Sequence, residues 1–477
     1  MSTISPRTTF LVSGGARGVT ASCVVGLARR YGSRFILLGR TSLDGDLPAW
    51  AEDGASESEL KARATAALEE AGEKPTPLAI RRLTDAIISR REVEATLQSV
   101  RDAGGKVAYL VVAGGQGSRL GFDKPKGMYP IGPVTQRTLF HIHAERILAL
   151  SRRHGASLPF LVMTSPATDA DTRAFFQEQR FFGLPEEDVW FFEQGTMPAL
   201  DLATGRVLLE APSRLFLSPN GHGGTLTGLK ESGLLERLRR RGVETIYYFQ
   251  VDNPLVNLAD LDFIGQHLAE RAEVSNKVIA KEAPSEKLGN YVLLDGRLGI
   301  IEYSDLTDEL ARLHQADGGL FFWAGNPAIH LFDLAFLEGL VREGDGIPWH
   351  VAKKKVPYLD DSGRLVEPDK ANALKFERFI FDVLPRAERW TVLPIRRDDE
   401  FEPLKNVEGK ESPATVRRAL TEQAARWLEA AGAKVERDAA GEPRPAIEVS
   451  PLFALDADEL ARKIETGLTV AAPLVLA

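Results

Sequence analysis

The sequence has one cysteine, Cys23, and no apolar run approaching the about 18 residues that a membrane-spanning helix needs. A single cysteine cannot form a disulfide within the chain, which favours a reducing compartment. The N-terminus also lacks the charged segment and long apolar core of a secretory signal. Together these absences predict a cytoplasmic protein that does not enter the membrane.

Other absences exclude whole classes of site. No G-x-x-x-x-G-K-[ST] motif occurs, which disfavours a P-loop ATPase. No histidines and cysteines have the spacing of zinc ligands, and His141 and His143 are expected on different faces of one helix. No internal repeat or low-complexity segment is apparent. A net charge of -8 argues against a nucleic-acid partner.

The composition is that of a folded protein with more than one domain. The chain has 477 residues, of which 44% are hydrophobic and 26% charged, and single cores rarely grow past about 300 residues. From Lys106 to about Phe263 strand-like and helix-like runs alternate, with one helix expected at 225–241, which predicts a mixed, mostly parallel sheet of an α/β fold. Short strand-like runs in the middle segment that begins at residue 274, the last of them at 318–326, predict a mixed extension of this sheet. We expect three domains, at residues 1–105, 106–385 and 386–477.

The stretch at residues 110–127, LVVAGGQGSRLGFDKPKG, is the most informative part of the chain. An apolar strand ends in a loop with four glycines, whose exposed backbone N–H groups can meet a phosphate. Arg119 and Lys126 add a planar and a compact cation. The alternative is a glycine-rich strand-to-helix turn that binds nothing. The P-K-G run around Lys126 instead favours a loop that binds a nucleoside triphosphate.

Asp252 ends another predicted strand, TIYYFQVD. A carboxylate at a strand terminus beside a triphosphate site is well placed for Mg²⁺, which prefers one or two carboxylates plus phosphate oxygens. The alternative is a turn role, since Asp252, Asn253 and Pro254 also form a good turn sequence.

The glycine loop resembles the AGGQG-[ST]-RLG and PKG signature of the UDP-sugar pyrophosphorylase family, in its UDP-N-acetylhexosamine branch. QGTMPA at 194–199, GNPAIH at 325–330 and NALK at 372–375 extend the resemblance over residues 106–460. The resemblance implies a nucleotide-diphospho-sugar transferase fold, preceded by a partial Rossmann-like unit and followed by a small C-terminal α+β domain. It also implies a UTP-dependent sugar-1-phosphate uridylyltransferase that makes a UDP-sugar and pyrophosphate.

The resemblance assigns roles to matching residues. Arg119 and Lys126 would hold the leaving pyrophosphate, and Lys375 would act on the sugar phosphate and the α-phosphate. The residues that would bind the nucleotide are Ala113, Gly114, Gly115, Gln194, Gly221 and Asp252, and Asp252 would also be the metal ligand. The residues that would bind the sugar are His222, Gly289, Glu302 and Asn326.

His222 departs from the acetylhexosamine branch, in which asparagine is expected, and is similar to the G-H-G of glucose-type uridylyltransferases. The sugar therefore stays open among N-acetylglucosamine 1-phosphate, which we expect first, N-acetylgalactosamine 1-phosphate and glucose 1-phosphate.

The first 105 residues resemble half of a ketoreductase of the short-chain-dehydrogenase type. Residues 7–40 predict strand, glycine turn, helix and strand, and the turn at 13–18 and Arg40 suit a pyrophosphate and the 2′-phosphate of NADP. A helical insert is expected at 58–103. Thr20 replaces the last glycine of the dinucleotide pattern, and no Tyr-x-x-x-Lys follows, so a packing module is favoured over an NADP-dependent reductase.

Overall fold

The computed structural model divides the chain into two compact units, Met1–Val100 and Arg101–Ala477. It describes residues 9–13, 34–38, 57–70, 106–315, 317–344, 346–465 and 467–477. In the first unit β1 (Thr9–Ser13) pairs in parallel with β2 (Arg34–Leu38), and α2 spans Glu57–Glu70. The glycine turn after Ser13 and Arg40 lie outside the described residues, so the ketoreductase resemblance and the NADP site stay predictions.

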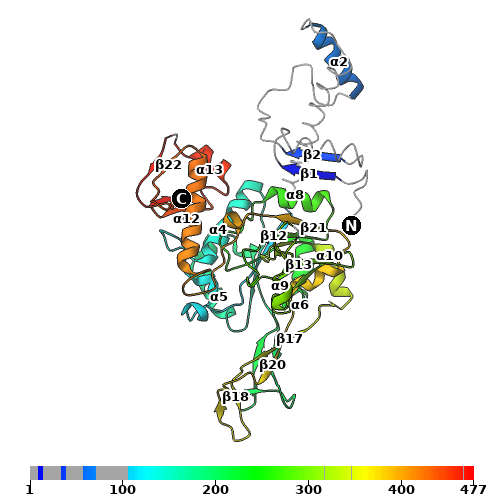
Figure 1. Ribbon diagram of the computed structural model, residues 1–477, viewed down its shortest axis with the longest axis vertical. Helices are drawn as coiled ribbons and strands as arrows, with labels where there is room; N and C mark the ends of the chain where they lie inside the picture. Colours follow the sequence, from blue (N-terminus) through cyan, green and yellow to red (C-terminus); the bar gives the residue numbers. More distant parts are fainter. Residues whose placement is uncertain are drawn as a thin grey trace. The chain divides into compact units, whose positions relative to one another are not determined.

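Four neighbouring parallel strands form one end of the second unit's large sheet, and other strands of this sheet are labelled in Figure 1. They are β3 (Val107–Val112), β4 (Phe160–Thr164), β5 (Val189–Glu193) and β11 (Thr245–Gln250), in the order β11-β3-β4-β5. The chain runs outward from β3 to β5 and then returns to the other side of β3. The strand order therefore reverses beside β3, which is where ligands bind in open α/β sheets.

Antiparallel strands extend the sheet beyond β11, as the sequence predicts for the middle segment. Their order is β14-β13-β15-β12-β16, and β21 pairs in parallel with β12. The strands are β12 (Val274–Ala280), β13 (Asn290–Leu294), β14 (Arg297–Ile301), β15 (Ala324–Gly325), β16 (His330–Asp333) and β21 (Trp390–Pro394). The predicted strand at 318–326 is wrong in length: only two residues pair, and Phe321 is exposed. The mixed α/β fold class is confirmed.

Helices connect the strands and cover the sheet: α4 (Leu139–His154), α5 (Asp169–Glu178), α6 (Gly224–Glu231), α7 (Leu234–Arg240), α8 (Leu261–Ala269), α9 (Asp308–Ala311) and α10 (Leu334–Arg342). Thr138 caps α4 by accepting a hydrogen bond from the His141 N–H, and Gly155 ends the helix in the left-handed region. The predicted single helix at 225–241 is wrong, because Gly233, with φ of 69°, divides it into α6 and α7.

The core lies between the sheet and these helices. Residues 107–111 of β3 are fully buried, and the ring of Tyr109 stacks on Tyr247 of β11 with 5.7 Å between centroids. Phe140 of α4 packs edge-on against Phe176 of α5. The parallel strands are therefore covered on both faces, and this packing holds the loops at their carboxyl ends in fixed positions.

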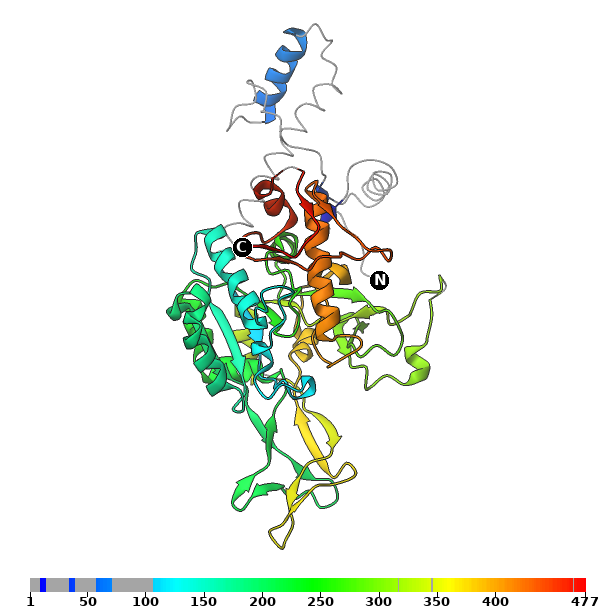
Figure 2. The same ribbon diagram turned by 90° about the vertical axis from the view of Figure 1, so that its left-hand side faces the viewer.

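Short strands build an arm that extends from the sheet at the lower end of Figure 2. Its three-stranded part has the order β17-β20-β7. The arm contains β6 (Thr196–Pro198), β7 (Leu200–Asp201), β8 (Leu209–Ala211), β9 (Arg214–Leu215), β10 (Leu217–Pro219), β17 (His350–Lys354), β18 (Tyr358–Leu359), β19 (Leu365–Val366) and β20 (Ala373–Glu377). Lys353, Lys354 and Lys355 are exposed, as expected for a solvated run.

The C-terminal part has its own apolar core around α12 (Pro413–Ala430), to which Ala425, Leu428, Ile447 and Leu460 contribute. Ser412 and Thr415 form a capping box at the start of α12. The other elements are α11 (Arg397–Glu400), α13 (Ala457–Lys463), β22 (Lys434–Val435), β23 (Ile447–Val449), β24 (Thr469–Val470) and β25 (Leu474–Leu476). The domain boundaries at 105 and 385 stay predictions. No helix in the described ranges is long and apolar enough to cross a membrane.

A matched pair of glycine substitutions tests this packing. A Cβ on Gly127 would lie 2.3 Å from the buried ring of Phe140, whereas a Cβ on Gly339, inside α10, would meet nothing within 4 Å. We expect Gly127→Ala to lower the stability by about 1–3 kcal/mol through overpacking. We expect Gly339→Ala to raise it by about 0.5–1 kcal/mol. Urea unfolding followed by fluorescence measures both, and equal midpoints for the two variants would contradict the packing.

Candidate active site

The loops that follow the parallel strands meet at one edge of the sheet. Gly114 follows β3, Ser165 follows β4, Gln194 follows β5 and Asp252 follows β11. The Ser165 hydroxyl donates a hydrogen bond of 2.8 Å to the Gly114 carbonyl, which joins two of these loops directly. The strand order thus gathers residues that are up to 138 positions apart into one candidate site.

The glycine loop is held by its own backbone hydrogen bonds, and part of its backbone is accessible. The Gly117 N–H donates to the Lys124 carbonyl at 2.9 Å, and the Lys126 N–H donates to the Gly115 carbonyl at 3.0 Å. Ala113 is buried, and its N–H continues the sheet by donating to the Met163 carbonyl. Gly115 is exposed, and a Cβ placed on it would have no atom within 4 Å. The loop therefore has room for a ligand against its backbone.

Lys126 and Asp252 face each other across the switch in strand order. The Lys126 Nζ lies 3.3 Å from the Asp252 Oδ2, and the two side chains are 20% and 18% exposed. The Leu404 N–H donates to the Asp252 carbonyl, and the His143 ring donates through Nε2 to the Val251 carbonyl. Burial lowers the pKa of His143 to about 3, so this ring is neutral. The backbone that carries Asp252 is thus held from α4 and from the C-terminal part.

Arg119 and Lys375 stand apart from this pair. Arg119 is exposed in the 3₁₀ turn Ser118–Leu120, after the glycines. Lys375 lies on β20 with its Nζ 5.2 Å from the ring centroid of Phe216, and desolvation lowers its pKa. In the described ranges, neither cation makes a hydrogen bond or ion pair with Lys126 or Asp252. The structure therefore joins only one of the three predicted cations to the aspartate.

Gln194 packs against the backbone of the glycine loop. It is 8% exposed, its N–H donates to the Thr164 carbonyl, and a Cβ on Gly114 would lie 2.6 Å from its side-chain nitrogen. Only glycine allows this approach at position 114. Asn220, which the sequence reasoning missed, is buried beside it: a Cβ on Gly195 would lie 2.7 Å from the Asn220 Nδ2. The glycines that follow Asn220 in the sequence are the feature that could have indicated its place in the site.

Gly221 and His222 form the second glycine turn. Gly221 has φ of 82°, and a Cβ there would lie 2.4 Å from the Arg378 carbonyl oxygen. The Ile380 N–H donates to the His222 Nδ1 at 3.2 Å, so the ring hydrogen is on Nε2. Burial, and then the charge of His350, lower the pKa of His222 to about 4. His222 is therefore a neutral ring with one N–H donor.

Gly289, Glu302 and Asn326, to which the resemblance assigns sugar binding, lie together in the structure. The Asn326 N–H donates to the Gly289 carbonyl at 2.9 Å, and a Cβ on Gly289 would lie 3.2 Å from the Glu302 Oε1. The Asn326 Oδ1 accepts from the Tyr291 hydroxyl and the Ala328 N–H, so its amide NH₂ remains as donor. This group thus offers a carboxylate and an amide donor.

The environment of Glu302 shifts its ionisation towards neutrality. Burial raises the pKa of Glu302 to about 7, Asp305 and Asp382 add to the shift, and His350 opposes it. His350, also missed by the sequence reasoning, bonds through Nε2 to the Asp382 carboxylate at 2.8 Å, and its ring lies 4.6 Å from Phe379. The lone histidine gave no signal in the sequence, because Asp382 is 32 positions away.

Asp252 has the donor chemistry of a magnesium ligand without being part of a cluster. Within the described ranges, no three His, Cys, Asp or Glu side chains gather as a metal site. A single carboxylate beside an open glycine loop nevertheless fits Mg²⁺, because this ion takes its remaining ligands from water and substrate phosphates. The residues present are compatible with a metal that arrives with a nucleotide.

Comparison with known proteins agrees with this architecture. Residues 61–467 match the family described as UTP–glucose-1-phosphate uridylyltransferase. The chain is 40% identical over 392 residues to the human UDP-N-acetylhexosamine pyrophosphorylase-like protein 1, covering 78% of this chain and 77% of that protein. It is 38% identical over 341 residues to the UDP-N-acetylglucosamine pyrophosphorylase of Saccharomyces cerevisiae, covering 70% and 72%.

Solved structures match as well. A putative UDP-N-acetylglucosamine pyrophosphorylase from Entamoeba histolytica has a TM-score of 0.73 and 30% identity, over 80% of this chain and 96% of that chain. The enzyme of that name from Trypanosoma brucei, solved with an inhibitor, has a TM-score of 0.68 and 26% identity, over 96% and 99%. The family predicted from residues 106–460 is confirmed: this chain belongs to the UTP–glucose-1-phosphate uridylyltransferase family, that of the UDP-sugar pyrophosphorylases.

Proposed function

We propose that this chain transfers the uridylyl group of UTP to N-acetylglucosamine 1-phosphate, giving the UDP-sugar and pyrophosphate. The single observation that carries the proposal is the Lys126–Asp252 pair at the strand switch, beside the open backbone at Gly115. The names of the relatives at 38–40% identity support the uridylyl donor and the acetylhexosamine. The single cysteine of the sequence supports a cytoplasmic location.

The nucleotide would lie along the glycine loop. The Gln194 side chain beside Gly114 offers the paired donor and acceptor that the edge of a uracil needs, and Gly221 brings a second stretch of backbone to the same end. The triphosphate would follow Ala113, Gly114 and Gly115 towards Lys126, where exposed N–H groups favour anions.

The reaction needs positioning and charge neutralisation rather than a protein nucleophile. A phosphate oxygen of the sugar phosphate attacks the α-phosphorus of UTP, and the bond from that phosphorus to the bridging oxygen of pyrophosphate breaks. Lys126 and Arg119 would balance the charge on the leaving pyrophosphate, and Lys375 that on the sugar phosphate. Asp252 would hold Mg²⁺, which supplies further positive charge to the phosphates when bound.

Sugar hydroxyls would meet the Gly289, Glu302 and Asn326 group. Glu302 accepts from hydroxyl groups when ionised, while the Asn326 amide donates. His222 specifically favours a second candidate, glucose 1-phosphate, because its Nε2–H is one donor where asparagine would present both a donor and an acceptor to an acetamido group.

Lys126 gives the first test. Lys126→Ala removes the cation that faces Asp252, and we expect kcat to fall about 100-fold or more without a change in the unfolding temperature. Lys124→Ala is the matched control, because Lys124 is exposed in the same loop and has no ion pair in the described ranges. Pyrophosphate release from UTP measures both. Near-normal turnover by Lys126→Ala would refute the proposed triphosphate-binding loop.

Glu302 gives the second test, through pH. Its raised pKa, about 7, means that the carboxyl takes up a proton as the pH falls through neutrality. We therefore expect the KM for the sugar phosphate to rise several-fold between about pH 8 and about pH 6. Glu302→Gln cannot titrate and should lose this dependence, which separates it from titration of the sugar phosphate itself. Identical pH profiles for both proteins would exclude Glu302 from sugar binding.

His222 gives the third test. We expect His222→Asn to change the ratio of kcat/KM for N-acetylglucosamine 1-phosphate over glucose 1-phosphate by about tenfold or more in favour of the former, because an amide pairs with the acetamido group. The two sugars assayed on one preparation serve as internal control. A variant that slows both sugars equally would show that His222 does not select the sugar.

A further inference from the structure

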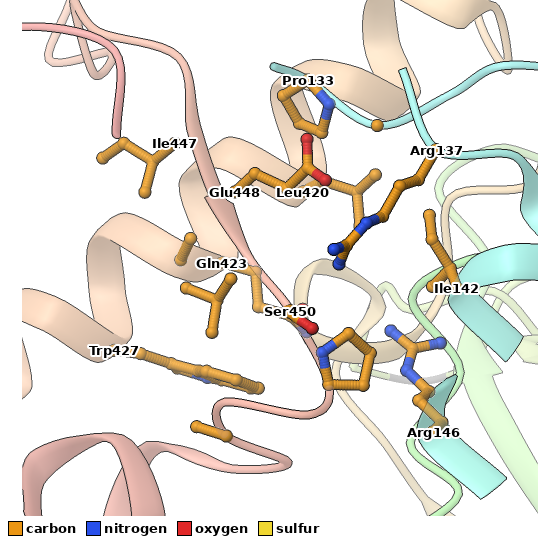
Figure 3. Close-up of a pocket in the computed structure, with 15 residues that line it drawn as sticks. Pro133, Arg137, Ile142, Arg146, Leu420, Gln423, Trp427, Ile447, Glu448 and Ser450 are labelled. Atoms are coloured by element: carbon orange, nitrogen blue, oxygen red, sulfur yellow. The ribbon is translucent and has the colours of Figure 1, made fainter. Parts of the chain in front are cut away.

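A pocket lies away from the candidate active site, between α4 and the C-terminal part (Figure 3). Its cavity is about 50 Å³, the room of a few water molecules. The guanidinium groups of Arg137 and Arg146 point into it from one wall, and Trp427 of α12 lies on the opposite wall. A small, polar ligand fits such a cavity better than a sugar or a nucleotide.

The carboxylates at this pocket already have partners. Glu448 accepts hydrogen bonds from the N–H groups of Val134 and Thr135 and from the Thr135 hydroxyl. Glu145 accepts from Arg137 at 2.8 Å and from the Ser450 hydroxyl at 3.0 Å. Glu145 and Arg137 therefore neutralise each other, and the Glu448 oxygens are bonded to neutral donors at residues 134 and 135.

Arg146 is the exception. Its Nη1 is buried without a hydrogen-bond partner, and no ion pair of Arg146 occurs among the described residues. Glu400 attracts it electrostatically, but the Glu400 Oε2 is bonded to the Lys277 ammonium and the Asn257 N–H. Burial lowers the pKa of Arg146 to about 10, so the group stays charged at neutral pH.

A buried, unpaired charge destabilises a folded protein, and replacing it by an apolar side chain is often neutral or stabilising. The Arg146 guanidinium is retained at this cost in stability and faces a cavity. These two features indicate that the cavity takes an anionic partner. Its planar N–H donors match the oxygens of a tetrahedral oxyanion. A cation is disfavoured, because the Glu448 oxygens already accept hydrogen bonds from Val134 and Thr135, whereas the Arg146 Nη1 has no acceptor in the described ranges.

We propose that the pocket lined by Arg137, Arg146, Trp427 and Ser450 binds a compact oxyanion of the phosphate class. The site is distinct from the uridylyltransferase centre, which is built from the loops after β3 and β11. It is nevertheless linked to it, since the pocket residue Gln423 donates to the Asp399 carbonyl and Asn253, next to Asp252, donates to the Glu400 carbonyl.

Inorganic phosphate is the probe, titrated calorimetrically into the full chain. We expect Arg146→Met to weaken binding at this site by about tenfold or more, because a charge-assisted contact is worth about 1.5–3 kcal/mol. In phosphate-free buffer its unfolding temperature should equal or exceed that of the unchanged chain. Arg152→Met is the matched control, since Arg152 is exposed on the same helix and has no ion pair in the described ranges.

Lys126→Ala separates the two anion sites and should retain the Arg146-dependent phosphate binding. If Lys126→Ala abolishes all phosphate binding while Arg146→Met leaves it intact, the pocket is no oxyanion site, and the proposed triphosphate-binding loop still stands. If Arg146→Met unfolds several degrees lower with or without phosphate, Arg146 is a structural counterion of Glu400 and the proposal fails.

Discussion

The reversal of strand order beside β3 is the constraint on which the site depends. Because β11 returns to the side of β3 opposite β4, the loops after β3 and β11 face each other at one edge of the sheet. The Lys126–Asp252 contact of 3.3 Å follows directly from this geometry. A one-residue register slip between these two buried strands would turn the side chains of the slipped strand to the opposite face and displace one member of the pair.

Packing from outside the sheet keeps this contact in place. Gly127 lies against Phe140 of α4, and His143 of the same helix donates to the Val251 carbonyl. On the other side Leu404 donates to the Asp252 carbonyl. One helix therefore supports both sides of the pair, while the C-terminal part supports the aspartate. The buried Lys277 ammonium pairs with both Glu400 and Asp260 nearby, so its loss would leave two carboxylates without their cation.

The electrostatic design differs between the two ends of the site. At the phosphate end the cations are partly exposed, which suits a ligand that arrives hydrated and leaves as pyrophosphate. At the sugar end His222 and Glu302 are desolvated, and each has its pKa shifted towards the neutral form. These desolvated groups select a sugar by hydrogen-bond pattern, while the charged groups at the other end attract any polyphosphate.

The sequence by itself determined the family, the parallel strands and the residues of the glycine loop, because buried apolar runs ending in glycines are local features. It also predicted the Gly289, Glu302 and Asn326 group, but only through resemblance. Only the tertiary structure decided the break at Gly233, the partnership of His350 with Asp382, the pairing of Lys126 with Asp252 and the surroundings of Arg146. These depend on contacts between residues far apart in the chain, which no local pattern of polarity or spacing encodes.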